Sequence, residues 1–170
     1  MSKSHRDWIQ ALITASCIAF IFVLALSAVF DPTIRVLHTL QAFIYIAVIV
    51  LSKKKSAWGY GAGCIMAAFW NWINLVHTNF IASGMRQLSQ LVRTGDLQRP
   101  DLLIAVFAAA AHFAIIAGCL LAFARKPNKT SADLGRFLGG GVLAIAWMVL
   151  IIVTTGRQYI PLLRRVFGIE

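Results

Sequence analysis

The chain has 170 residues, of which 59% are hydrophobic and only 13% are charged, with a net charge of +10. Ordinary soluble domains contain about 45–50% apolar and about 25% charged residues, and here the charges are also confined to short clusters between long uncharged runs. This composition excludes a soluble globular domain, and the lack of alternating segments of about ten residues excludes a membrane β-barrel. We expect an all-α fold, a polytopic bundle of about five transmembrane helices that forms a single integral membrane domain over residues 1–170.

The first expected span covers residues 8–30, with Trp8 as an anchor at the membrane interface. Its apolar run is too long for the core of a cleavable signal peptide. Pro32 then breaks the helix, because proline disfavours helical geometry at the residue before it, and the second span covers residues 34–51. One face of the second span carries polar side chains at helical spacing: Arg35, His38, Gln41 and Tyr45.

The third expected span, residues 57–81, carries no charge, yet its second half holds three asparagines and a histidine. Amide and imidazole groups are costly in hydrocarbon unless they meet partners, so we expect them to face protein, water or a ligand. In its first half, small residues recur at every fourth position and would let another helix approach closely. These helix-packing residues are Gly59, Gly63 and Ala67.

The polar stretch from Met85 to Pro100 follows the third span, and its apolar residues fit one helical stripe. We expect a short interfacial helix there, ending before Gly95. The fourth span, residues 102–124, is rich in alanine, and His112 is its only strongly polar residue.

The fifth expected span covers residues 137–155 and opens on three consecutive glycines. Gly140 and Ala144 share one of its faces, which we assign to helix packing. The C-terminal tail around Pro161 is amphipathic, and we expect it to lie along the membrane interface.

The basic residues stand at the ends of the apolar runs, which is typical of topology determinants and headgroup contacts. Nucleic acid would need a basic stripe on one folded face, so we expect membrane lipids and no nucleic acid as partners. Five spans place nine positive residues on the N-terminal side and seven on the other, and the positive-inside rule then predicts a cytoplasmic N-terminus in the cell membrane. The nine are Lys3, Arg6, Lys53, Lys54, Lys55, Arg125, Lys126, Lys129 and Arg136; the seven are Arg35, Arg86, Arg93, Arg99, Arg157, Arg164 and Arg165.

The same topology brings the polar residues of spans two, three and four toward one side of the membrane. We expect a cavity there, lined by uncharged donors, acceptors and aromatic rings, that binds or passes a neutral polar or aromatic molecule or a lipid. The candidate ligand-binding residues are His38, Gln41, Tyr45, Trp70, Asn71, Asn74, His77 and His112.

Two alternatives remain open at this stage. The same amides and imidazoles can simply hydrogen-bond between helices and hold the bundle together. His38 and His77 would also lie at a similar depth on adjacent spans, as two axial ligands of haem b would need, in an accessory or redox subunit of a larger membrane complex.

Catalysis is not indicated, because no acidic residue lies within an apolar span and no HExxH or nucleophile motif occurs. The missing carboxylates also argue against a metal site. The three cysteines lie inside apolar spans without any CxxC spacing, as buried small residues do. Five short spans form only a small pore, so we expect a homo-oligomer or a subunit of a membrane complex.

Overall fold

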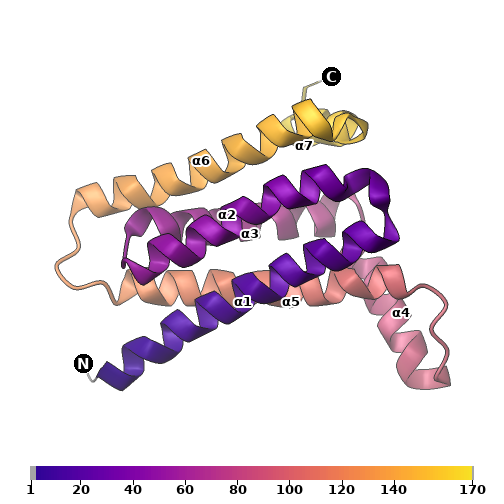
Figure 1. Ribbon diagram of the computed structural model, residues 1–170, viewed down its shortest axis with the longest axis horizontal. Coiled ribbons are helices and arrows are strands. Elements are labelled where there is room, and N and C mark those ends of the chain that lie inside the picture. The colour runs from indigo at the N-terminus through magenta and orange to yellow at the C-terminus, as the bar shows by residue number, and fades with distance from the viewer. Residues whose placement is uncertain (1–2, 170) are drawn as a thin grey trace.

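The computed structural model describes residues 3–169, with side chains from Trp8 onward. Residues 1, 2 and 170 of the expected domain lie outside it, as do the side chains of Lys3 and Arg6, which entered the charge count above. Most of the described chain is helical, and the described residues contain no β-strand. The expected all-α bundle is therefore confirmed (Figure 1).

The helices follow one another with short connections. They are α1 (Lys3–Phe30), α2 (Arg35–Lys53), α3 (Ala57–Trp72), α4 (Phe80–Thr94), α5 (Pro100–Ala124), α6 (Ser131–Thr155) and α7 (Ile160–Phe167). Three single helical turns lie between them: η1 (Pro32–Ile34), η2 (Ile73–His77) and η3 (Arg157–Tyr159).

Four helices are long and apolar enough to cross a membrane, and they correspond to the expected spans one, two, four and five. Their segments are Trp8–Phe30, Pro32–Lys53, Pro100–Ala124 and Ser131–Thr155. The shortest of these has 22 residues, which is about 33 Å of helix and matches a hydrocarbon core of about 30 Å. The fifth span begins earlier than expected, because Thr130 caps the helix through a capping box with Asp133.

The expected third span, residues 57–81, is not one helix. Regular α-helix ends at Trp72 after 16 residues, or about 24 Å, and continues as the wider π-helical turn η2. Asn79 then adopts a left-handed conformation with φ of 56°, which stops the helix and redirects the chain into α4. The bundle thus has four membrane-length helices and a fifth, shorter one, and the expected interfacial helix starts at Phe80.

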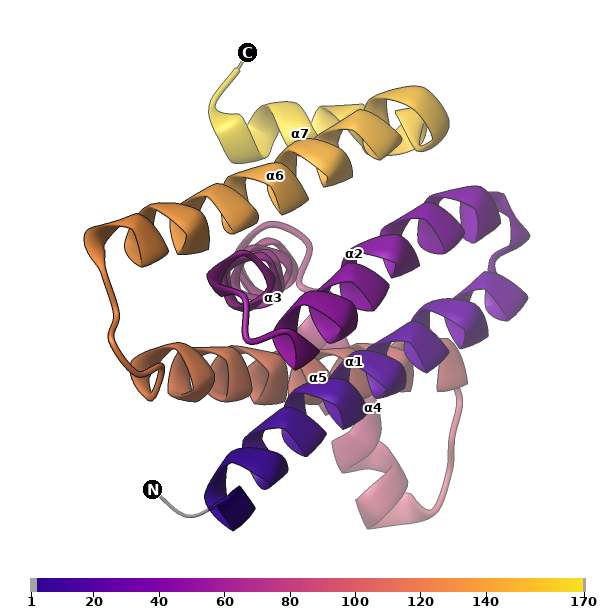
Figure 2. The same ribbon diagram turned by 60° about the vertical axis from the view of Figure 1, so that its left-hand side comes forward.

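The short helix α3 occupies the centre of the bundle. Figure 2 shows it nearly end-on, with α6 on one side and α2 and α5 on the other, while α1 packs against α2 and α5. Most residues of α3 are buried. A helix enclosed by its neighbours needs few lipid-facing side chains, so α3 can carry polar groups that a peripheral helix could not.

Glycines allow α3 to approach its neighbours at backbone distance. A Cβ atom on Gly61 would overlap the carbonyl of Phe137 in α6, and one on Gly140 would overlap the carbonyl of Trp58 in α3. Small-residue contacts of this kind drive helix association in lipid. The residues assigned to helix packing are all buried within the chain: Gly59, Gly63, Ala67, Gly140 and Ala144.

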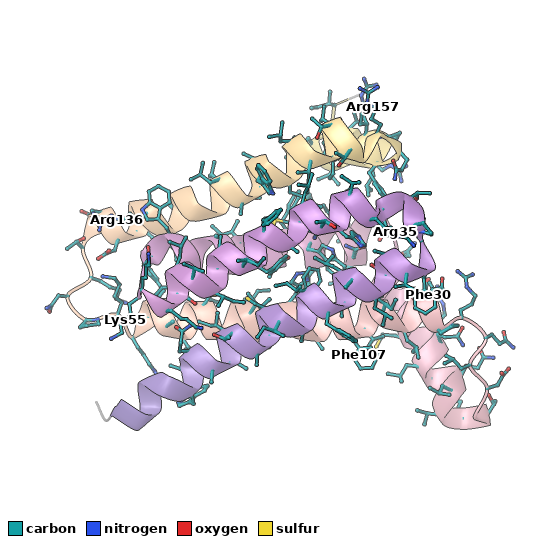
Figure 3. All side chains as sticks on the ribbon, viewed as in Figure 1. Phe30, Arg35, Lys55, Phe107, Arg136 and Arg157 are labelled. Atoms are coloured by element: carbon teal, nitrogen blue, oxygen red, sulfur yellow. The ribbon has the colours of Figure 1, made fainter. Side chains whose placement is uncertain are left out.

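The connections separate into two ends of the bundle. Figure 3 places Lys55 and Arg136 at one end and Phe30, Arg35 and Arg157 at the other. The helices α4 and α7 belong to this second end, where α4 diverges from the bundle and α7 folds back beside α6 (Figures 1 and 2). Among the described residues, the basic side chains are therefore divided between the two ends of the bundle as the sequence predicts.

Replacing Gly61 by alanine should destabilise the bundle. The added methyl has to push α6 away from α3, and we expect the free energy of unfolding to fall by about 1–3 kcal/mol. Gly135→Ala on α6 is the matched control, since nothing lies within 4 Å of its added Cβ and alanine favours helix over glycine by about 0.5–1 kcal/mol. Thermal unfolding in detergent should rank Gly135→Ala at or above wild type and Gly61→Ala below it; the opposite order would contradict the tight α3–α6 contact.

Candidate functional site

A cavity of about 360 Å³ lies inside the bundle, at the end that holds the α1–α2 turn. Its size is at the lower end of small-molecule sites, which span about 300–1,000 Å³. Most of its lining is apolar or aromatic, with Phe20, Met66 and Trp70 from α1 and α3 and Ala108 from α5. None of the residues that line it is an Asp, Glu, Lys or Arg. A neutral, largely apolar molecule fits such a lining, because a charge buried there would have no counter-ion.

The C-terminal helix α7 covers this cavity. Leu162, Leu163 and Val166 line it, whereas Arg164 and Arg165 on the same helix are exposed. Phe167 stacks on Phe69 of α3, with ring centroids 6.2 Å apart. The expected amphipathic tail is therefore a helix whose apolar face covers the cavity and whose basic residues face outward.

Tyr159, in the turn that leads into α7, also lines the cavity. Burial, and to a lesser degree the nearby Asp31 carboxylate, raise the pKa of its phenol above the usual value. The phenol is thus neutral at physiological pH. The rim of the cavity therefore adds no charge to the neutral lining.

Gln41 is the most deeply buried polar residue in the cavity wall. Its side chain is 1% exposed, and its Nε2 is buried without a hydrogen-bond partner. The amide is directed toward the Tyr45 hydroxyl, one turn further along α2, without completing a hydrogen bond to it. An unpaired buried donor of this kind costs about 1–3 kcal/mol, and this nitrogen is buried too deeply to reach a molecule in the cavity.

His38 lies one turn before Gln41 and also lines the cavity. Its Nδ1 lies 3.1 Å from the Leu24 carbonyl oxygen and 2.8 Å from the Ser27 hydroxyl oxygen of α1. A carbonyl oxygen can only accept, so we assign the ring hydrogen to Nδ1, and Nε2 of the neutral ring is then an acceptor. Helix α1 thereby orients the imidazole and sets its tautomer.

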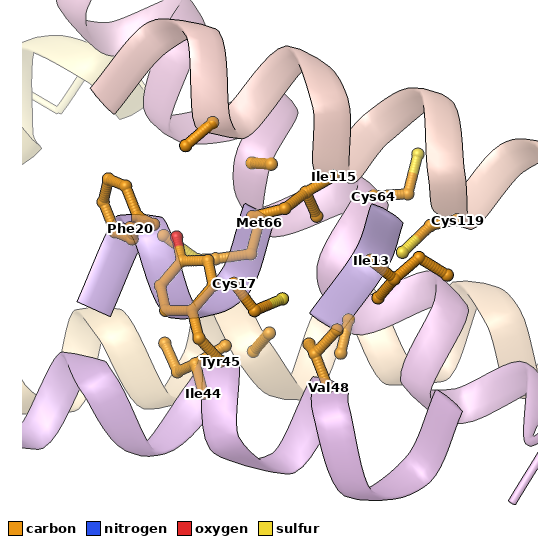
Figure 4. Close-up of a cluster of buried hydrophobic side chains, with 14 of the residues drawn as sticks. Ile13, Cys17, Phe20, Ile44, Tyr45, Val48, Cys64, Met66, Ile115 and Cys119 are labelled. Carbon is orange, nitrogen blue, oxygen red and sulfur yellow. The ribbon is translucent and has the colours of Figure 1, made fainter. Parts of the chain in front are cut away.

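Tyr45 and His112 form a hydrogen-bonded pair beneath the cavity. The phenol oxygen lies 2.6 Å from His112 Nε2, and both side chains are completely buried. The His112 ring also packs on Phe20 and Trp70, at centroid distances of 3.9 and 4.7 Å. Figure 4 shows Tyr45 within the apolar core beside Phe20 and Met66. These two predicted ligand-binding residues thus close the floor of the cavity and do not line it.

The two asparagines of the polar segment have different environments. Asn74 lines the cavity, but its amide donates to the Trp70 carbonyl at 2.9 Å and accepts from the Thr78 hydroxyl at 3.1 Å. It therefore holds the π-helical turn η2 in place. Asn71 is buried with both amide atoms unpartnered, next to Trp70, whose ring packs on His112.

His77 lies in η2 and is not among the residues that line the cavity. Its ring contacts the edge of Trp72, with centroids 4.9 Å apart. The haem b alternative needs His77 and His38 to face one space; His38 lines this cavity and His77 does not, and haem binding stays a prediction. Among the described residues, no three His, Cys, Asp or Glu side chains form a group that could hold a metal ion.

Sequence reasoning thus placed His38, Gln41, Trp70 and Asn74 at the cavity and missed much of its wall. Ser27 and Phe20 line it from α1, a span for which the sequence analysis names no ligand-binding residue. The contribution of α7 was also missed, although its leucine pair followed by an arginine pair indicated one apolar face. Its apolar face was assigned to the membrane interface, whereas it lies on the protein.

Comparison with protein-family models, with curated proteins and with solved structures finds no match for this chain. Its function therefore has to be inferred from the cavity and from the residues around it.

Removing the Tyr45 hydroxyl should destabilise the fold through His112. Tyr45→Phe leaves a buried imidazole nitrogen without a partner, and we expect a loss of about 1–3 kcal/mol in unfolding free energy. The double variant Tyr45→Phe/His112→Leu should recover most of that loss, because neither polar partner remains. Denaturant unfolding in mild detergent measures both effects; a double variant less stable than Tyr45→Phe would contradict this assignment.

Proposed function

We propose that this integral membrane protein binds a neutral, membrane-soluble small molecule or lipid chain in the cavity that α7 covers. The observation that carries the proposal is the cavity of about 360 Å³ itself, which α7 covers and which is lined mostly by apolar residues and by no Asp, Glu, Lys or Arg. A bound ligand would bury its hydrocarbon body in this space, and that burial favours the occupied state.

Binding is favoured over passage through the bundle. Phe20 lines the cavity and packs on Tyr45 and His112 beneath it, and all three side chains are 0% exposed. A solute would have to displace this packed and hydrogen-bonded layer to continue toward the other end. Transport, if it occurs, would then require a second conformation of these three side chains.

The membrane orientation and the assembly belong to the same proposal. A cytoplasmic N-terminus, which the positive-inside rule favours, places the cavity and α7 at the opposite surface. A homo-oligomer or a larger complex stays a prediction.

Filling the cavity should abolish binding without unfolding the protein. Ala108 is buried in the lining, whereas Ala110 on the same helix is exposed on the outer face, so Ala108→Phe and Ala110→Phe form a matched pair. The probe is a dibrominated long-chain alcohol, whose bromines quench tryptophan fluorescence on contact. Each protein is measured together with its Trp70→Phe counterpart. The difference in fluorescence quenching between the two gives the part that depends on Trp70.

We expect saturable Trp70 quenching in wild type and in Ala110→Phe, and a loss of at least about tenfold in apparent affinity in Ala108→Phe. Circular dichroism and gel filtration in the same detergent verify that both variants are folded. Equal saturable quenching in the two phenylalanine variants, or none specific to Trp70 in wild type, would overturn the proposed function.

A further inference from the structure

Two short turns meet at the end of the bundle that holds the cavity, and both contribute to its lining. Ile34 lines the cavity from η1, and Tyr159 lines it from η3. The turns pack together, because a Cβ atom on Gly156, just before η3, would overlap the Leu37 side chain of α2. Tyr159 also lies near the Asp31 carboxylate, just before η1. The cavity therefore extends to the level at which the membrane-length helices α1 and α6 end.

An arginine belongs to or adjoins each of these turns. Arg35, the first residue of α2, directly follows η1, and Arg157 is the first residue of η3. Both side chains are exposed, and Figure 3 places both at this end of the bundle. Arg35 donates through Nε to the Ala28 carbonyl at 3.2 Å, but neither arginine forms an ion pair with another described residue. Their charges are thus left for a group that lies at the membrane surface.

The surface around the two turns is positive. Residues 31–35 and 157–167 carry four arginines and one carboxylate, a net charge of +3; they are Arg35, Arg157, Arg164, Arg165 and Asp31. The carboxylate does not neutralise an arginine, since its Oδ1 accepts from the Thr33 backbone N–H at 3.0 Å and from the Thr33 hydroxyl at 2.6 Å. An anion would therefore meet unpaired positive charge at this surface, whereas the lining of the cavity offers it none.

The basic residues at the two ends of the bundle differ in kind. The seven at this end are all arginines, whereas the six lysines of the chain all belong to the opposite end. The positive-inside rule counts lysine and arginine alike, so it does not account for this division. A guanidinium group binds phosphate through two parallel N–H···O bonds, whereas the lysine ammonium group acts as a point charge. The exclusive use of arginine thus favours recognition of phosphate oxygens, which lipid head groups present at this depth.

The cavity runs inward from the two turns. Its lining on α2 extends to Gln41, seven positions after Ile34, and its lining on α1 extends from Ser27 to Phe20. Each of these stretches corresponds to about 10 Å along a helix, or about a third of a hydrocarbon core of about 30 Å. A hydrocarbon chain in the cavity would therefore occupy the outer third of the bundle, and a head group attached to it would lie at the level of the two turns.

We propose that the ligand is a lipid with an anionic phosphate head group, whose phosphate oxygens bind Arg35 and Arg157 and one of whose chains fills the cavity. This inference rests on the proposed function, because it specifies the ligand of the same site. The apolar lining accepts the chain, and the two arginines select the head group.

The test compares two probes with the same dibrominated chain: the long-chain alcohol and its phosphate monoester. Trp70-dependent quenching is titrated with each probe, using purified full-length protein in a non-ionic detergent and its Trp70→Phe counterpart. In wild type we expect the monoester to bind about tenfold more tightly than the alcohol, because its charged oxygens form stronger hydrogen bonds to the guanidinium groups. Partition of the probes into micelles is the same for every variant, so a change in this preference reports on the protein.

Arg35→Gln/Arg157→Gln should reduce the preference to about threefold or less, because both positive charges are removed. Arg86→Gln/Arg93→Gln is the matched control and should keep the wild-type preference. It removes two exposed arginines from α4 at the same end, neither of which lines the cavity or forms an ion pair with another described residue. Unchanged binding of the alcohol verifies that the cavity is intact in each variant. The single variants Arg35→Gln and Arg157→Gln replace the double variant if it does not fold.

Inorganic phosphate distinguishes a lipid from a free anion. In about tenfold excess over the monoester it should leave the monoester bound, because the buried chain holds the head group at the arginines at a high effective concentration. If inorganic phosphate instead lowers the affinity for the monoester to that for the alcohol, the arginines bind free phosphate and the lipid inference is overturned.

The remaining outcomes separate the two proposals. Equal affinity for both probes in wild type, an unchanged preference in Arg35→Gln/Arg157→Gln, or an equal loss in the α4 control would overturn the phosphate inference and leave the proposed function standing. If neither probe quenches Trp70 saturably, the proposed function itself fails. A preference present in wild type and in the α4 control but lost in Arg35→Gln/Arg157→Gln supports both.

Discussion

Hydrocarbon offers no hydrogen-bond partners, and this constraint governs every polar side chain in the bundle. Most of them are satisfied between or within helices. Tyr45 pairs with His112, and Trp147 on α6 donates to the Leu40 carbonyl of α2 at 3.0 Å. Among the described residues, the buried side-chain atoms left without a hydrogen-bond partner belong to Gln41, Asn71, His77 and His112. Only Gln41 among these four residues lines the cavity.

The same helices are packed tightly at one end and spread at the other. Near the N-termini of α3 and α6, glycines bring the two backbones into contact. Toward the opposite end, α6 rises away from α5 (Figure 1), and the larger side chains Met148 and Ile152 line the space between them. The cavity is thus a consequence of helix crossing: close approach at a glycine contact requires separation further along. The apolar face of α7 covers the opening that results.

The π-helical turn η2 completes this arrangement. A wider turn leaves backbone groups without their usual partners, and here the Asn74 amide binds the Trp70 carbonyl that faces it. Asn79 then reverses the chain in a left-handed conformation. Residues that the sequence presents as one polar membrane segment therefore have separate tasks: Trp70 lines the cavity, Asn74 stabilises the turn and Asn79 ends it.

Composition and the length of the hydrophobic runs by themselves determined the class of protein and its four long helices. They also determined the amphipathic segments and the grouping of charges at the two ends. All of these features follow from the cost of placing polar groups in hydrocarbon. Tertiary structure alone decided which polar side chains meet. Helix register paired Tyr45 with His112 and removed them from the cavity, and the contact of Gly61 with α6 placed α3 at the centre. It also brought α7 over His38 and Gln41. Such contacts depend on rotation and crossing of whole helices, which local residue patterns do not specify.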